Sequence, residues 1–135
     1  MAVELSEKVR KALDGPEFWA LATVNPDGSP QVSTVWVMPK DDKILVNTAL
    51  GRKKPRNLDN EPRVALSWVN PENGYHTASI QGRVVDKYTG DQAEADIDSL
   101  AEKYIGQTPY PWRSPGEQRV TYVIEPTHFY EQDPS

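Results

Sequence analysis

The sequence predicts a mainly β domain that folds as a small antiparallel barrel of about six strands. Short apolar runs recur along the 135 residues, and clusters of Asn, Pro, Asp and Gly separate them as turn signals. The one long helical pattern comes late, so the chain lacks the alternation of strands and helices that builds a parallel sheet. We therefore expect residues 1–135 to form a single domain.

The N-terminal region is expected to supply a helix and two strands. Apolar side chains recur at a spacing of four residues from Leu5 to Leu13, which predicts a short amphipathic helix over residues 6–13. Residues 17–24 are rich in aromatic and apolar side chains and lead into the turn N-P-D-G-S. Residues 31–38 then alternate between two faces with period two, which predicts a second strand.

A basic joint and a short helix follow the third predicted strand. That strand covers residues 44–48, after a turn over residues 39–43. Gly51 can supply an unusual backbone angle at the joint, and Pro55 is acceptable in the first turn of a short helix that runs to Asp59.

The second half of the chain is predicted to hold the remaining strands and the one long helix. Gly82 interrupts the longest strand, where glycine marks a bulge, a bend or the close approach of a ligand. Pro126 separates two short strands near the C-terminus. The predicted elements are strands over residues 63–69, 75–88, 119–125 and 127–131, a helix over residues 91–105 and a proline-rich loop over residues 106–117.

The composition excludes several classes of protein. A net charge of -5 argues against attraction to nucleic acid or to an anionic membrane. The absence of cysteine excludes disulfides, thiolate metal sites and cysteine nucleophiles. The first residues lack the pattern of a signal peptide, and no apolar run reaches the length of a membrane span. We therefore expect a cytoplasmic protein with neither a nucleic-acid nor a membrane partner.

Four basic residues lie within five positions of the joint: Arg52, Lys53, Lys54 and Arg56. A strand that turns into a helix directs free backbone N–H groups outward, and these cations would surround them with positive charge. Such a joint predicts a cradle for a phosphate or a carboxylate. A solvated basic turn paired with Asp59 and Glu61 is the alternative, and the cluster by itself leaves both open.

No catalytic or metal-ligating constellation is evident. His76 and His128 fall in predicted strands without the spacing of metal ligands, so we read them as surface or hydrogen-bonded side chains. The serines lack a nucleophile elbow, and G-R-K-K lacks the glycine spacing of a P-loop. The basic joint, with Ser33, Thr34 and Asn47 on strands, instead suits a cofactor that brings its own chemistry.

Three stretches follow one another in a specific order: F-W-A-L-A-T-V-N-P-D-G-S-P-Q-V-S-T-V-W-V, I-L-V-N-T-A-L-G-R-K-K-P-R-N-L-D-N-E-P-R-V-A-L-S and S-I-Q-G-R-V-V. In this order they resemble the pyridoxamine-5'-phosphate-oxidase-like split β-barrel superfamily, and within it the deazaflavin-dependent (coenzyme F420) reductases of actinobacteria. The similarity covers residues 17–88. It implies a six-stranded split β-barrel and a homodimer with two cofactor sites at its interface.

The resemblance also implies which residues bind the cofactor. The deazaflavin ring and its chain would be lined by Gln31, Ser33, Thr34, Val35 and Trp36, with Asn47 and Thr48 beside them. The phosphate and the polyglutamate tail would be held by Arg52, Lys53, Lys54 and Arg56. Gln81 and Gly82 would approach the ring through their backbone, and the partner chain would supply Tyr110, Trp112 and Arg113.

The implied activity is transfer of a hydride from reduced F420 to an unsaturated small molecule. Four clustered cations suit a tail with several negative charges better than the single phosphate of flavin mononucleotide (FMN). The C-terminal sequence H-F-Y-E-Q-D-P-S lacks the basic ending with histidine that pyridoxamine phosphate oxidases use for their substrate. An FMN-binding oxidoreductase of the same fold and a non-catalytic F420- or flavin-binding protein remain as alternatives.

Overall fold

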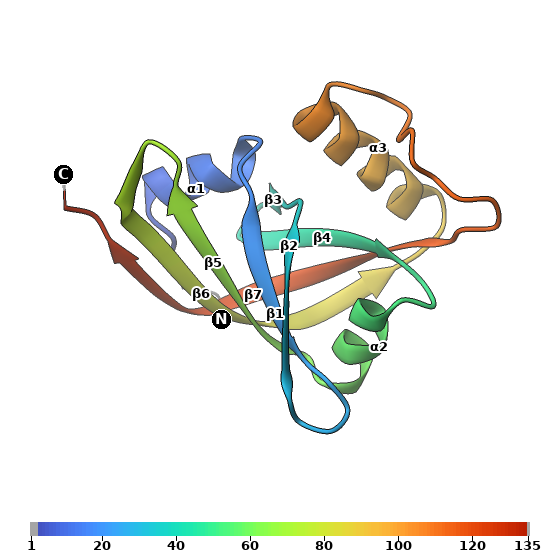
Figure 1. Ribbon diagram of the computed structural model, residues 1–135, viewed down its shortest axis with the longest axis horizontal. Helices are drawn as coiled ribbons and strands as arrows, with labels where there is room; N and C mark the ends of the chain where they lie inside the picture. Colours follow the sequence, from blue (N-terminus) through green and yellow to red (C-terminus); the bar gives the residue numbers. More distant parts are fainter. Residues whose placement is uncertain (1–2, 135) are drawn as a thin grey trace.

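The computed structural model describes residues 3–134 as one antiparallel sheet with three helices around it (Figure 1). The strands are β1 (Trp19–Val24), β2 (Pro30–Val35), β3 (Met38–Lys40), β4 (Lys43–Ala49), β5 (Arg63–Asn70), β6 (Asn73–Tyr88) and β7 (Arg119–Gln132). The helices are α1 (Glu7–Asp14), α2 (Lys53–Asn60) and α3 (Asp91–Ile105). None of these helices is long and apolar enough to cross a membrane.

The sheet is strongly curled because its two end strands are consecutive in the chain. The strand order is β2-β1-β5-β6-β7-β4-β3, and only Trp36 and Val37 separate β2 from β3. Since an extended chain spans at most about 3.3–3.6 Å per residue, the two ends of the sheet must lie close together. No pairing joins β2 to β3 among residues 3–134, so the barrel is open on this side.

The predicted mainly β, antiparallel fold with three helices is confirmed, but the prediction of six strands is wrong. The sheet has seven strands because residues 38–40, assigned to the end of strand two and the following turn, form the separate strand β3. Met38 pairs with Leu45 across a tight turn that contains Asp41. The alternation of apolar side chains continues through the crossing, because Val35 and Val37 are both buried, and it therefore hides the break.

The predicted division of the C-terminal strand at Pro126 is also wrong. Strand β7 runs without interruption through Pro126, which pairs with Gly82 where the register between β6 and β7 shifts. Proline has no N–H to donate and is tolerated at such an irregularity. The Pro126 carbonyl accepts a hydrogen bond from the Val3 N–H at 3.1 Å.

Helix positions follow from their end signals. The Ser6 side chain caps α1 by accepting the Val9 N–H at 3.2 Å, and α3 covers the predicted residues 91–105. Helix α2 begins at Lys53, so Pro55 lies in its first turn, as predicted. Gly51 has φ +90° in the joint before α2, a backbone angle that glycine adopts without strain.

The hydrophobic core fills the inside of the curled sheet. Trp19 of β1 and Tyr122 of β7 are its largest fully buried side chains, and Val9 and Leu13 of α1 join them. In Figure 1 the end of β4 lies between α2 and α3, and both helices contact this strand. This end of β4 positions the candidate site.

Candidate functional site

A cavity of about 220 Å³ opens where β2, β4, α2, α3 and the loop after α3 meet. It brings together more than half of the residues that the sequence predicted. Its predicted lining residues are Thr34, Val35, Trp36, Asn47, Thr48, Arg52, Lys54, Tyr110 and Trp112. Ile97, Leu100 and Arg119 complete the lining.

Lys54 is one of two cations of the basic joint, with Arg52, that line this cavity. Its side chain is half-buried, and within residues 3–134 its ammonium group has neither a hydrogen bond nor an ion pair. Burial lowers the pKa of Lys54 below its ordinary value, and the charges of Arg52 and Arg119 lower it further. An anion bound in the cavity would stabilise the charged ammonium group and so oppose both causes of the lowered pKa.

Two arginines stand beside Lys54, and both contact Glu117. Arg52 donates to Glu117 Oε1 at 3.1 Å, and Arg119 donates to the same oxygen at 2.6 Å. Burial raises the pKa of Glu117, but the hydrogen bonds from Arg119 and the Ser114 N–H, together with the charges of Arg119 and Arg52, keep this pKa below its ordinary value. The carboxylate therefore stays charged and partly neutralises the cradle.

Asn47 orders the floor of the cavity rather than offering a free amide. Its Nδ2 donates to the Ala93 carbonyl at 2.9 Å and to Thr121 Oγ1 at 3.0 Å. Its Oδ1 accepts from Arg119 Nε at 2.9 Å. Because these contacts use both ends of the amide, we assign Asn47 a positioning role for Arg119.

Aromatic rings also line the cavity, and the ring of Tyr110 packs against the guanidinium of Arg119 at 5.2 Å. Trp36 stacks on Tyr104 with a ring-centroid distance of 5.2 Å and meets the edge of Tyr110 at 6.2 Å. Trp112 lies 6.1 Å from Trp36 and is 61% exposed. The cavity thus combines cations with aromatic rings, a combination suited to a planar ring that carries an anionic chain.

Tyr110 and Trp112, for which the resemblance suggests a role in the partner's site, line the cavity of their own chain in this structure, because the loop returns across Trp36. Arg113 does not line this cavity. Its guanidinium contacts Glu94 at 3.1 Å and Asp98 at 3.2 Å, which ties the loop to α3.

Several other predicted residues lie outside the cavity. Lys53 and Arg56 line a separate, outer hollow of about 570 Å³ on the other side of the start of α2, which shares Arg52 with the first cavity. Gln81 and Gly82 line a third hollow of about 360 Å³ at β5, β6 and β7.

Two predicted residues on the inner face of β2, Gln31 and Ser33, do not line the cavity. Gln31 Oε1 accepts from Thr23 Oγ1 at 2.8 Å. Ser33 Oγ is buried and has no hydrogen-bond partner within the described chain. Because alternate strand residues share a face, Ser33 points to the same side of β2 as Val35, which does line the cavity. The Ser33 hydroxyl is therefore a polar group that lacks its partner.

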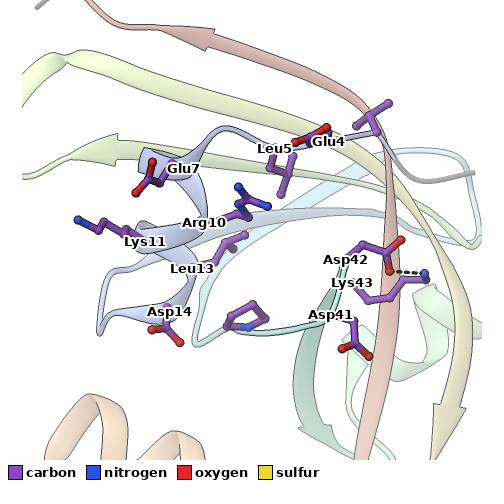
Figure 2. Close-up of a pocket in the computed structure, with 12 residues that line it drawn as sticks. Glu4, Leu5, Glu7, Arg10, Lys11, Leu13, Asp14, Asp41, Asp42 and Lys43 are labelled. Atoms are coloured by element: carbon purple, nitrogen blue, oxygen red, sulfur yellow. Dashed lines mark hydrogen bonds and ion pairs between the residues drawn. The ribbon is translucent and has the colours of Figure 1, made fainter.

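A hollow of greater volume than the candidate site lies elsewhere. It encloses about 710 Å³ between α1 and the hairpin of β3 and β4, and Figure 2 shows residues from both elements around it. Its lining includes Arg10, Leu13 and Asp41, and none of the predicted site residues. Size alone therefore does not identify the candidate site.

The two histidines have different environments. His76 is buried, its Nε2 lies 2.7 Å from Glu131 Oε2, and its Nδ1 lies 3.0 Å from Asn70 Nδ2. With an amide donor facing Nδ1, the proton of the neutral ring is on Nε2, which donates to Glu131. His76 is thus a hydrogen-bonded side chain, one of the two readings that the sequence suggested. His128 is exposed.

Sequence reasoning assigned no role to two residues that shape the site. Tyr104 was expected only on the apolar stripe of α3, yet its hydroxyl donates to the Glu17 carbonyl at 2.6 Å and accepts the Val37 N–H at 3.1 Å, which fixes the crossing that carries Trp36. Arg119 is 3% exposed inside the cavity wall. No signal in its sequence neighbourhood distinguishes Arg119, because its partners come from distant segments.

The chain belongs to the pyridoxamine 5'-phosphate oxidase family, whose model matches residues 5–133. This assignment places it in a family of oxidoreductases and confirms the resemblance drawn from the sequence. A solved structure described as an F420 reductase has a TM-score of 0.81 and 32% identity, and the match covers 93% of this chain and 98% of that one.

Two further relatives support the family and the fold. A pyridoxine/pyridoxamine 5'-phosphate oxidase from Rubrobacter xylanophilus is 33% identical over 84 residues, which are 60% of this chain but only 39% of that protein. The conserved hypothetical protein Rv2991 from Mycobacterium tuberculosis has a TM-score of 0.76 at 20% identity, and the match covers 98% of this chain and 86% of that one. The latter likeness concerns the fold alone.

Proposed function

We propose that this protein is an F420-dependent oxidoreductase that transfers a hydride from reduced deazaflavin to an unsaturated small molecule. The observation that carries the proposal is Lys54, a half-buried cation without a partner in the described chain, which opens into a cavity walled by Trp36. The match to an F420 reductase over almost the whole chain supports the choice of cofactor.

The residues present fit such a cofactor in three respects. Lys54 and Arg52 supply cations for its phosphate and acidic tail, and Lys53 and Arg56 line the outer hollow that continues past Arg52. The buried Ser33 hydroxyl has no hydrogen-bond partner within the described chain, and a polar atom at the edge of the deazaflavin ring could provide one. Trp36 offers an aromatic face against which a planar ring can pack.

Reduced F420, when bound, supplies the hydride. The protein's contribution is to hold, orient and desolvate the reactants. The stacked pair Trp36 and Tyr104 keeps one wall rigid, and Tyr110 and Trp112 shield the cavity from water. No carboxyl or imidazole group lines this cavity among residues 3–134, so we expect solvent to protonate the product.

We further propose that the active form is a homodimer. A cavity of about 220 Å³ is smaller than the roughly 300–1,000 Å³ usual for a small-molecule site, so a second chain would have to complete it. One part of the outer sheet face has no Lys, Arg, Asp or Glu and offers an interface, and the pair Arg63 and Arg83 borders it on the same face. Its paired positions are Thr34, Ala20, Ser67, Ser79 and Tyr130, and beside them Val32, Ala22, Ala65, Gln81 and His128.

The dimer proposal predicts the effect of a charge at the centre of this face. Ala65→Arg should give a monomer in sedimentation experiments, because a two-fold interface would bury the new charge twice and an uncompensated buried charge costs about 3–5 kcal/mol, more than a hundredfold in affinity. Gln107→Arg, in the exposed loop after α3, is the matched control and should remain dimeric. A dimer that persists in Ala65→Arg would exclude this face.

The lowered pKa of Lys54 predicts a pH dependence of anion binding. Because the ammonium form must be present to bind, affinity should fall with rising pH earlier than an ordinary lysine would require. Above pH 8, where phosphate esters are fully ionised, binding should take up protons. Calorimetry in two buffers of different ionisation enthalpy measures this uptake. The uptake should vanish in Lys54→Ala, and an unchanged uptake in that variant would assign it to another group.

The cofactor is tested by titrating the purified protein with F420 and with FMN. We expect F420 to bind more tightly by about a hundredfold, because its tail carboxylates add at least one charge-assisted contact worth about 1.5–3 kcal/mol. Tighter binding of FMN would favour the FMN-dependent alternative of the same fold.

A further inference from the structure

Glu117 is an internal anion that already pairs with two cations of the cavity, although it does not itself line the cavity. Its side chain is 4% exposed, and both carboxylate oxygens accept hydrogen bonds: Oε1 from Arg52 and Arg119, and Oε2 from the Ser114 N–H at 3.1 Å. A ligand that enters the cavity therefore meets three cations, Lys54, Arg52 and Arg119, of which two are shared with a resident carboxylate.

The two arginines hold Glu117 with unequal strength. Arg119 is 3% exposed, bonds Glu117 at 2.6 Å, and is fixed further by Asn47 at 2.9 Å and by the Tyr110 ring at 5.2 Å. Arg52 has a 54% exposed side chain, and its one side-chain hydrogen bond within the described chain is the 3.1 Å contact with Glu117. Arg52 is thus the cation that can leave Glu117 for a ligand, whereas Arg119 stays.

We propose that Glu117 is a specificity-determining residue that sets a charge threshold for ligands of this cavity. A ligand with one negative charge attracts Arg52 no more strongly than the carboxylate of Glu117 does. Glu117 also competes at a high effective concentration, because it belongs to the same chain and is held next to Arg52. A phosphate dianion or a polyanion offers more charge and takes Arg52. The site therefore admits simple carboxylates only through Lys54 but engages phosphorylated ligands through Lys54 and Arg52 together.

This inference rests on the anion cradle of the proposed function but not on the deazaflavin. Its test therefore uses inorganic pyrophosphate and acetate, with affinities measured by calorimetry or by amide shifts in α2. The wild-type protein should prefer pyrophosphate by about a hundredfold or more, the value of one to two charge-assisted contacts. In Glu117→Gln, the affinity for acetate should rise about tenfold and the affinity for pyrophosphate much less. The preference for pyrophosphate over acetate should therefore become smaller.

Controls separate this selective effect from a general change of charge. Glu102→Gln removes an exposed carboxylate of α3 and should leave both affinities unchanged. In a protein that already carries Arg52→Ala, adding Glu117→Gln should no longer reduce the preference for pyrophosphate over acetate. The proposal would be overturned if Glu117→Gln raised the affinities for both probes equally, or if it still reduced the preference for pyrophosphate in the absence of Arg52. A wild-type protein that does not bind pyrophosphate would also overturn it.

A second variant keeps the test decisive should Glu117→Gln fail to fold, since that change leaves the buried Arg119 without its anion. Arg52→Ala keeps the pair between Glu117 and Arg119 intact. It should lower the affinity for pyrophosphate by about tenfold and leave the affinity for acetate unchanged, because acetate does not contact Arg52. Equal losses for both probes would contradict the threshold. Because neither probe contains a deazaflavin, a failure of F420 to bind would refute the cofactor assignment and leave this result standing.

Discussion

Replacing Lys54 by alanine should weaken F420 binding by about tenfold to a hundredfold, the value of one charge-assisted contact of about 1.5–3 kcal/mol. Lys54 is the half-buried cation of the joint, and its ammonium has no protein partner within residues 3–134. The fold should not suffer, because the substitution also removes the repulsion from Arg52 and Arg119 that lowers the pKa of Lys54. Fluorescence or calorimetric titration measures the affinity, and thermal unfolding checks the fold.

Lys53→Ala is the matched control for this experiment. It removes the same charge one residue away, from an exposed side chain that lines the outer hollow instead of the cavity. We expect a loss of no more than a few-fold, of the size typical for an exposed ion pair. The losses in both variants should shrink as salt rises, because screening acts over about 8–10 Å at ordinary ionic strength. Equal losses in the two variants would mean that the cluster acts only through its summed charge.

Replacing Gly82 by valine should destabilise the protein by about 3 kcal/mol or more, the upper end of the range for overpacked interiors. A Cβ at this position would lie 2.8 Å from the Glu125 carbonyl oxygen and 2.8 Å from Ile124 Cγ2. The backbone of β7 occupies that space, and a carbonyl in the sheet cannot move aside as a flexible side chain can. Urea or thermal unfolding measures the loss.

Gly74→Val provides a control on the same strand. An added Cβ at Gly74 would meet nothing within 4 Å, so this variant should differ from wild type by no more than about 0.5 kcal/mol. If Gly82→Val is as stable as Gly74→Val, the close approach of β7 does not explain the glycine. Packing against β7 accounts for Gly82 within a single chain, and the register between β6 and β7 shifts beside it. A bulge at this position is one of the three readings of the sequence, together with a bend and the approach of a ligand.

The sequence predicted those elements whose signals are local. Helix α3 follows from apolar side chains at spacings of three and four and from Gly106, which ends the helix in a left-handed conformation. Strand β3 could not be predicted, because Val35 and Val37 are both buried and the alternation runs through the crossing. The continuity of β7 through Pro126 depends on a register shift against Gly82, which is a property of the pair of strands.

The site shows the same division between local and distant determinants. The basic joint is a local pattern, and the helix that starts at Lys53 determines where its side chains point. Lys54 lies on the same side of the helix as the buried Leu58, four residues further on, whereas Arg56 is exposed to solvent. The contact between Arg52 and Glu117 joins residues 65 positions apart, and the sequence gives no sign of it. The placement of Trp112 beside Trp36 likewise depends on the path of the loop after α3.

Hydride transfer from the deazaflavin tests the central claim most directly. Reduced F420 that carries deuterium at its hydride-donating position is mixed with the protein and a panel of unsaturated acceptors without oxygen, and the product is examined by mass spectrometry. We predict oxidation of F420 that depends on both protein and acceptor, with one deuterium in the product and a rate that falls in Lys54→Ala. Tight binding of F420 with no deuterium in any product would contradict the enzymatic account and identify the protein as a cofactor-binding protein without turnover.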